Sequence, residues 1–311
     1  MKEINILDIE NVKIGNAEDK VGKTGITVIL CEGGAPAGVD VRGGGPASRE
    51  TELLNPLAAA DKIHAVVLSG GSAFGLDAAG GVMQYLEEKN IGFDTGVTKV
   101  PLVCQSCIFD LVVGSKDARP DKKMAYTACQ NAEKGNFSCG NVGVGTGATV
   151  GKLLGPDFMM KSGVGAYAAQ IGDIKVGAVV CVNALGDVFD KDSGKQIAGL
   201  LAEDKKTLLN TTDMMCKMIE TPHNLFTGNT TIGAVITNAA FNKSQLCKIA
   251  AMAQNGLARV IDPVHTMADG DSVYALSTGN KTADINVVGT LAAHVMAKAI
   301  NVAVISAQKD K

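Results

Sequence analysis

A threonine at the start of a strand-like run is the first residue of this sequence that could act as a nucleophile. In the stretch LFTGNTTIGAVITNA (residues 225–239), a small polar turn precedes Thr230 and Thr231, and an apolar, β-branched run follows. A threonine hydroxyl is a weak nucleophile until a base removes its proton. If the chain is cut between Asn229 and Thr230, the new α-amine of Thr230, with a pKa of about 7.7–8.0, can serve as that base.

Such chemistry places two demands on the local sequence, and this stretch meets both. The nucleophile should begin a strand that holds it rigidly, and a turn-forming residue should precede it, as Asn229 does. Many strands also begin with threonine after asparagine, so an ordinary turn into a strand explains the local pattern equally well.

A second arrangement with chemical potential lies near the C-terminal end. His265 with Asp269 or Asp271, and a Ser or Thr elsewhere, is compatible with a nucleophile–base–acid triad. Nothing in the spacing requires a triad, and a lone histidine before a turn is typical of a hydrogen-bonded loop residue.

Two further motifs carry less weight. GTGATVGKL (residues 145–153) departs from the phosphate-binding loop, because Thr146 and Leu153 stand where that motif needs glycine and Ser or Thr. CQSC, with Cys104 and Cys107, lacks the second cysteine pair or histidine pair of a metal site, and an incidental pair is favoured over a redox pair. We therefore expect neither a nucleotide, a metal nor another cofactor.

The elements that must position these residues are strands and helices, which are mixed before the stretch at 225–239 and alternate after it. Apolar β-branched runs predict strands at 25–30, 64–69, 175–183, 231–237 and 272–278. Helical spacing predicts helices at 72–89, 122–134, 203–220, 242–261 and 284–300. Two sheets sandwiched between helix layers would use all of these elements.

Composition narrows the class of protein. The 311 residues are 46% hydrophobic and 20% charged, with a net charge of −3 and no long run of one sign, which argues against nucleic-acid binding. The sequence shows no secretion signal and no run of eighteen uncharged apolar residues, so we expect no membrane span. Eight cysteines in so long a chain do not indicate a disulfide scaffold, and we expect a cytoplasmic location.

Long segments of the sequence, in the same order, resemble the DmpA-type aminopeptidase family, which includes D-aminopeptidases, β-peptidyl aminopeptidases and nylon-oligomer hydrolases. The resembling segments are GVDVRGGGPASRETELLNP (38–56), VVLSGGSAFGLDAAGGV (66–82), GNVGVGTGATVGK (140–152), TGNTTIGAVITNA (227–239) and ARVIDPVHTMADGDSVYALSTG (258–279). The nylon-oligomer hydrolase branch is the most similar, because its nucleophile is also a threonine preceded by asparagine.

The resemblance implies a fold and a maturation step. The fold is α/β, a four-layer αββα sandwich of the N-terminal-nucleophile type, similar to that of ornithine acetyltransferases. A single domain of residues 1–311 would cut itself at Asn229–Thr230 into pieces 1–229 and 230–311 that stay together. Thr230 would then form an acyl-enzyme with an amide substrate, and water would release the acid.

The resemblance also assigns roles to residues that are ordinary by themselves. Asn183 matches the side-chain amide that donates to the oxyanion, although alone it is typical of a strand-end turn. Lys152 matches a lysine near the nucleophile, where a cation keeps the Thr230 amine neutral, although alone it is typical of a solvated loop.

The resemblance adds four more positions to the predicted site. Asp269 and Asp271 match acidic or hydroxyl-bearing positions that contact the nucleophile, although locally they also fit an Asp-Gly hairpin turn. Phe109 stands where nylon hydrolases have a tyrosine, so a hydrogen-bond donor is missing there and substrate preference should differ. Ser72 is a candidate for the substrate pocket, with a helix N-cap as the favoured interpretation.

Two alternatives remain open on the sequence. The same acyl-enzyme would serve an acyltransferase of the ornithine acetyltransferase type, and an unprocessed chain of this fold would be a non-catalytic assembly protein. The expected partners are a small amide or peptide substrate and further copies of the chain, a tetramer by resemblance, without nucleic acid or membrane.

Overall fold

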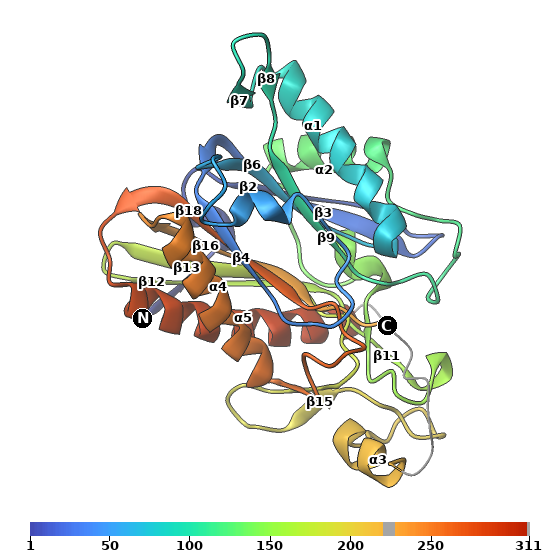
Figure 1. Ribbon diagram of the computed structural model, residues 1–311. Coiled ribbons are helices and arrows are strands. Elements are labelled where there is room, and N and C mark those ends of the chain that lie inside the picture. The colour runs from blue at the N-terminus through green and yellow to red at the C-terminus, as the bar shows by residue number, and fades with distance from the viewer. Residues whose placement is uncertain (220–227, 310–311) are drawn as a thin grey trace.

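Two β-sheets pack face to face between two layers of helices in the computed structural model, which describes residues 1–219 and 228–309 (Figure 1). Helices α1 (Ala79–Glu88) and α2 (Lys122–Glu133) cover the outer face of one sheet. Helices α4 (Lys243–Ala258) and α5 (Ile285–Gln308) cover the outer face of the other. The predicted α/β class and αββα layer order are confirmed.

The two sheets differ in size and are accompanied by three small ones. The larger sheet has the order β1 (Lys2–Ile4), β12 (Val164–Ile171), β13 (Ile174–Cys181), β16 (Ile232–Ala239), β18 (Ser272–Lys281) and β4 (Ala37–Val41). The second sheet has the order β2 (Lys13–Asp19), β3 (Thr24–Ala35), β6 (Ile63–Ser69), β9 (Val103–Cys107) and β5 (Ser48–Arg49). The small sheets are β10 (Thr149–Val150) with β11 (Met160–Lys161), β14 (Asp187–Phe189) between β15 (Gln196–Ala198) and β17 (Ile261–Asp262), and β7 (Phe93–Asp94) with β8 (Lys99–Val100).

Strand β13 shows why the central strands are almost wholly apolar. Its residues Val176, Ala178 and Val180 pack in the cluster beneath α4 and α5, while Val179 and Cys181 pack in the cluster between the two sheets. A strand buried on both faces must be apolar at every position rather than at alternate ones. This explains the continuous run KVGAVVCV that indicated the strand.

Helix α5 is long and apolar enough to cross a membrane by length and composition alone. In the structure, however, most of its apolar window is buried, and it packs against α4, β12 and β13. Its apolar character is therefore that of a core helix.

The predicted helix at 203–220 is wrong over its first half. Helix α3 covers only Thr211–Lys217, and Asn210 caps it by accepting from the Asp213 N–H. Before it, the Asp204 carboxylate accepts from the N–H groups of Lys206 and Thr207, which closes a turn. Side-chain bonds of this kind compete with helical bonds. Residue 220, where the prediction ended, and Thr227 of the turn before Thr230 lie outside the described residues.

Candidate active site

Strand register brings the predicted site together at one end of the larger sheet. Strand β16 is parallel to β18, with Ile232 opposite Ser272, and antiparallel to β13, with Ile232 opposite Cys181. The residues that precede β16 therefore lie beside those that precede β18 and those that follow β13. Accordingly, the Thr230 N–H donates to the Asn183 carbonyl at 2.8 Å.

The carbonyl oxygen of the peptide bond between Asn229 and Thr230 accepts two hydrogen bonds. The Thr230 hydroxyl donates to the carbonyl oxygen of Asn229, and the Gly270 N–H donates to the same oxygen at 2.8 Å. Thr230 is only 4% exposed and Asn229 only 2%. The Gly270 N–H withdraws electron density from the carbonyl, and the Thr230 hydroxyl is in hydrogen-bond contact with the oxygen of the same carbonyl.

Lys152 and Asn183 form a second group of donors, which binds the carbonyl of Gly228, the residue before Asn229. Lys152 Nζ donates to the Asn183 side-chain oxygen at 2.6 Å, to the Asn183 carbonyl at 3.1 Å and to the Gly228 carbonyl at 2.9 Å. Asn183 Nδ2 donates to the Phe109 carbonyl at 3.1 Å and to the Gly228 carbonyl at 3.4 Å. In the uncut chain both side chains thus hold the carbonyl of Gly228, and the predicted oxyanion role of Asn183 stays a prediction.

Burial changes the charge state of the lysine. Lys152 is buried, and burial lowers its pKa to about 7, against the opposing effect of the Asp269 charge. The amine therefore changes charge near neutral pH, unlike a lysine in water.

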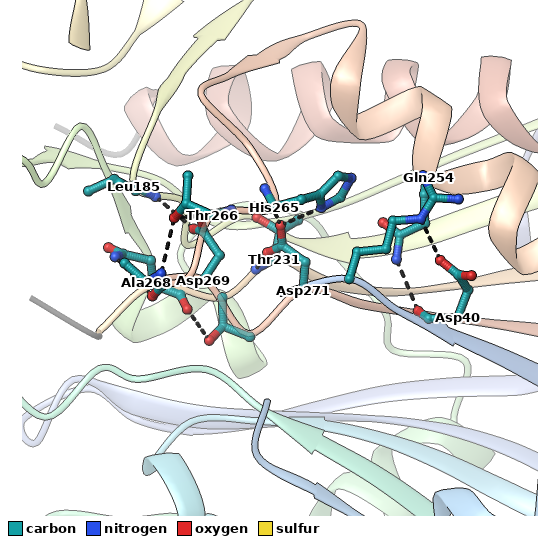
Figure 2. A network of polar contacts seen from close by, with 12 residues as sticks. Asp40, Leu185, Thr231, Gln254, His265, Thr266, Ala268, Asp269 and Asp271 are labelled. Atoms are coloured by element: carbon teal, nitrogen blue, oxygen red, sulfur yellow. Dashed lines mark hydrogen bonds and ion pairs between the residues drawn. The ribbon is translucent and has the colours of Figure 1, made fainter. Parts of the chain in front are cut away.

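The two predicted carboxylates bind different partners (Figure 2). Asp269 accepts from the Thr266 hydroxyl at 2.5 Å and N–H at 3.0 Å and from the Leu185 N–H at 3.3 Å. Asp271 accepts from the Thr231 N–H at 2.7 Å and is 2.8 Å from His265 Nδ1. Both are buried, and burial together with the Asp271 charge raises the pKa of Asp269. The alternative of an Asp-Gly hairpin turn is wrong, because β17, the strand before this turn, pairs with β14 in a different sheet and not with β18.

Phe109 and Ser72 follow strands β9 and β6 of the second sheet, and only Phe109 has a hydrogen bond to a residue of the site. The Phe109 backbone reaches Asn183, as described above, and the Ser72 N–H donates to the Ile108 carbonyl at 2.9 Å. The favoured N-cap interpretation of Ser72 is wrong. Gly71 occupies the N-cap position, no side chain caps this 3₁₀ helix (Ser72–Ala78), and Ser72 is its first residue, with φ +54°.

The competing motifs have structural explanations. Cys104 and Cys107 are free, buried thiols of β9, which contact the Glu50 carbonyl and the Ser69 hydroxyl respectively. The glycine-rich turn at 143–147 is a buried 3₁₀ segment. Across the described residues, no group of three or more His, Cys, Asp or Glu side chains could hold a metal ion.

Two residues of the site were missed by sequence reasoning. Gly270 supplies the N–H to the Asn229 carbonyl, and Thr266 holds the Asp269 carboxylate. The available signal was the glycine between two aspartates, which allows a backbone to approach closely.

The close packing around Gly270 predicts that a larger residue there slows the cleavage. A Cβ added at residue 270 would lie 2.8 Å from Thr230 Oγ1 and 2.7 Å from the Gly45 carbonyl. We expect Gly270→Ala to slow cleavage before Thr230 by about 10²-fold, because a small displacement of a reacting group has a large cost. The matched control is Gly33→Ala, where a Cβ meets nothing within 4 Å. Gel analysis of precursor loss over time measures the cleavage rates of the two variants. Equal rates for Gly270→Ala and Gly33→Ala would contradict the packing argument.

His265 is placed to orient Asp271, and no hydrogen bond between the described residues joins it to the Thr230 hydroxyl. We expect His265→Ala and His265→Asn to cut within about 10-fold of the normal rate, because each loses only the side-chain hydrogen bond to Asp271. The asparagine variant matters because residue 265 has φ +60°, which asparagine tolerates. A folded His265→Asn protein that stays uncut would restore the histidine triad.

Comparison with known proteins identifies the family of this chain. The chain matches peptidase family S58 over residues 5–310, and it belongs to that family. It is 36% identical to a protein named uncharacterized aminopeptidase from Mycobacterium leprae, over 98% of this chain and 91% of the relative. It is 30% identical to a 6-aminohexanoate-oligomer endohydrolase from a Kocuria species, over 94% of this chain and 84% of the relative.

Solved structures support the fold. An L-aminopeptidase D-Ala-esterase/amidase from Ochrobactrum anthropi, described as a variant of the Ntn (N-terminal-nucleophile) hydrolase fold, matches with a TM-score of 0.71 at 17% identity, over 98% of this chain and 85% of that one. A β-aminopeptidase from a Burkholderia species matches with a TM-score of 0.63 at 19% identity, over 96% and 84%. The chain thus has the Ntn hydrolase fold and is an amidohydrolase or peptidase of family S58.

Proposed function

We propose that this member of peptidase family S58 cuts its own chain between Asn229 and Thr230 and then hydrolyses amides with Thr230 as an N-terminal nucleophile. The observation that carries the proposal is the Thr230 hydroxyl lying on the Asn229 carbonyl, with the Gly270 N–H on the same oxygen. This contact supports the proposal, because the hydroxyl would attack a carbonyl that it already touches and the Gly270 N–H would serve as the oxyanion donor.

The first step moves the acyl group from nitrogen to oxygen. Thr230 Oγ forms a bond to the Asn229 carbonyl carbon, the bond from that carbon to the Thr230 nitrogen breaks, and the hydroxyl proton goes to the nitrogen. Water then cleaves the resulting ester, which releases the Asn229 carboxylate and restores the hydroxyl. The Gly270 N–H is positioned to stabilise the negative charge that develops on the carbonyl oxygen.

The two pieces have reason to stay together after the cut. Strands β16 and β18 belong to the second piece, but β16 pairs with β13 and β18 pairs with β4, both of the first piece. The larger sheet and the two core clusters that pack on it thus contain residues of both pieces. Separating the two pieces would expose a large apolar surface.

In the mature protein the freed α-amine of Thr230 acts as the base. It takes the hydroxyl proton as Thr230 Oγ attacks the substrate carbonyl, and it returns a proton to the leaving amine. Lys152, buried beside this point, favours the neutral amine of Thr230 while its own amine is protonated, and Asp271 fixes the backbone through the Thr231 N–H.

Denaturing mass spectrometry of the purified protein tests the proposal directly. Two fragments, 1–229 and 230–311, together with release of product from an amide substrate, are the expected result. A single full-length species that hydrolyses no amide would overturn it.

A further inference from the structure

Asp110 is a buried carboxylate at the edge of the active site that the mechanism above does not use. It directly follows Phe109 and is only 3% exposed. Its carboxylate oxygens accept from the Thr24 hydroxyl at 2.6 Å and from the Gly71 N–H at 2.7 Å. Burying a carboxylate is costly unless hydrogen bonds satisfy it, so these two bonds hold Asp110 firmly in one place.

The backbone of three segments closes on the Asp110 side chain. Thr24 begins β3, Gly70 follows β6, and Gly147 ends the buried 3₁₀ segment at 143–147. A Cβ added at Gly70 or at Gly147 would collide with the Asp110 side chain, so only glycine allows this close approach. The side chain and the main chain of residue 110 therefore have little freedom to move.

The carbonyl of the preceding residue, Phe109, helps to fix which way the Asn183 amide is turned. Asn183 Nδ2 donates to that carbonyl at 3.1 Å, while Asn183 Oδ1 accepts from Lys152 Nζ at 2.6 Å and from the Thr149 N–H at 3.1 Å. Turning the amide over would bring its nitrogen against two donors and its oxygen against a carbonyl. One Nδ2 hydrogen is thus fixed on Phe109, and the other is left for a carbonyl in the site, which in the uncut chain is that of Gly228 at 3.4 Å.

We propose that Asp110 is a positioning residue for the amide hydrolysis proposed above, on which this inference rests. Its bonds to Thr24 and Gly71 hold residue 110 in place and with it the Phe109 carbonyl. That carbonyl turns Asn183 Nδ2 toward the oxyanion of the substrate, the role predicted for Asn183. Asp110 thus acts through Phe109 on the transition state, where a correctly aimed donor matters most, and not on substrate binding.

The charge of this carboxylate has to be separated from its anchoring role. Burial raises the pKa of Asp110, and hydrogen bonds to its oxygens and the Lys152 charge oppose this effect. In turn, the Asp110 charge raises the pKa values of Lys152 and Lys161, against the lowering effect of burial. Removing the carboxylate therefore changes both the anchor of the Phe109 carbonyl and the charge near Lys152.

The test compares Asp110→Ala with Asp110→Asn, because both lack the charge and only one lacks the anchor. Asparagine keeps an oxygen for the Gly71 N–H and a polar group beside the Thr24 hydroxyl, whereas alanine keeps neither. The probes are L-alanine p-nitroanilide and the linear 6-aminohexanoate dimer. Rates are expressed per chain whose Thr230 terminus has been verified by mass spectrometry.

Asp187 provides the matched control for removal of a buried carboxylate. It is also buried, and it likewise accepts from one threonine hydroxyl and from backbone N–H groups, those of Thr211 and Leu200. Asp187→Ala and Asp187→Asn therefore report the general cost of losing such a group, without any bond to the residues that hold Phe109.

We expect kcat of Asp110→Ala to be about 10-fold or more below that of Asp110→Asn, with KM within about 3-fold, because a misaimed oxyanion donor costs transition-state stabilisation. The Asp187 pair should show no such gap. If the folded Asp110→Ala chain fails to mature while Asp110→Asn matures, that is the same expected order, since Asn183 also holds the Gly228 carbonyl before the cut.

Equal kcat values for Asp110→Ala and Asp110→Asn, a difference confined to KM, or the same gap in the Asp187 pair would overturn the inference and leave amide hydrolysis standing. Unaltered protein that has a verified Thr230 terminus and hydrolyses neither probe would instead contradict the proposed function itself.

Discussion

Replacing Thr230 by alanine is expected to leave the purified chain in one piece, whereas the unaltered chain yields fragments 1–229 and 230–311. The hydroxyl on the Asn229 carbonyl is the only atom of Thr230 that can attack it, and alanine removes that atom while keeping the strand. Loss of a nucleophile abolishes the covalent step rather than slowing it, so we expect no cut product over days. Intact-mass measurement distinguishes the two outcomes.

Thr231 provides the matched control for this experiment. It is the same residue type, also buried and next in the chain, but it is positioned through its N–H bond to Asp271. We expect Thr231→Val to cut, and Thr230→Ser to cut as well, because serine keeps the hydroxyl. Cutting before residue 230 in the Thr230→Ala protein would exclude this hydroxyl as the nucleophile.

The layers of the fold were predictable because their signals are strong and local. The run at 175–183 is apolar at nearly every position, as a strand buried on both faces must be, and the helix at 242–261 was predicted to within a few residues of α4. The false helix at 203–210 arose because helical composition does not reveal that Asp204 closes a turn with Lys206 and Thr207.

The site was only partly predictable, because most of it depends on register. Thr230, Lys152, Asn183, Asp269 and Asp271 were all singled out, and the structure brings them to one end of the larger sheet. Sequence alone could not show that the aligned ends of β13, β16 and β18 would place the Gly270 N–H on the Asn229 carbonyl. Nor could it show that Asn183 and Lys152 hold the carbonyl of Gly228 in the uncut chain.

Lys152→Met should slow self-cleavage by about 10²-fold or more. Methionine keeps most of the side-chain volume but removes the positive charge and the three bonds to Gly228 and Asn183. As negative charge develops on the Asn229 carbonyl, the protonated Lys152 amine one peptide unit away stabilises it, and loss of about 3 kcal/mol of such stabilisation corresponds to that factor. The half-life of the precursor, followed on gels after synthesis, gives the rate.

Lys161 separates this effect from the general cost of removing a buried lysine. Burial lowers its pKa to about 8, and its Nζ donates to three carbonyls, those of Gly145, Ala148 and Ser162, none of them at the cut. Lys161→Met should therefore lose thermal stability much as Lys152→Met does, yet cut at close to the normal rate. If the two variants were equally slow to cut at equal stability, the role of Lys152 would be structural, and its charge near the cut would not matter to the reaction.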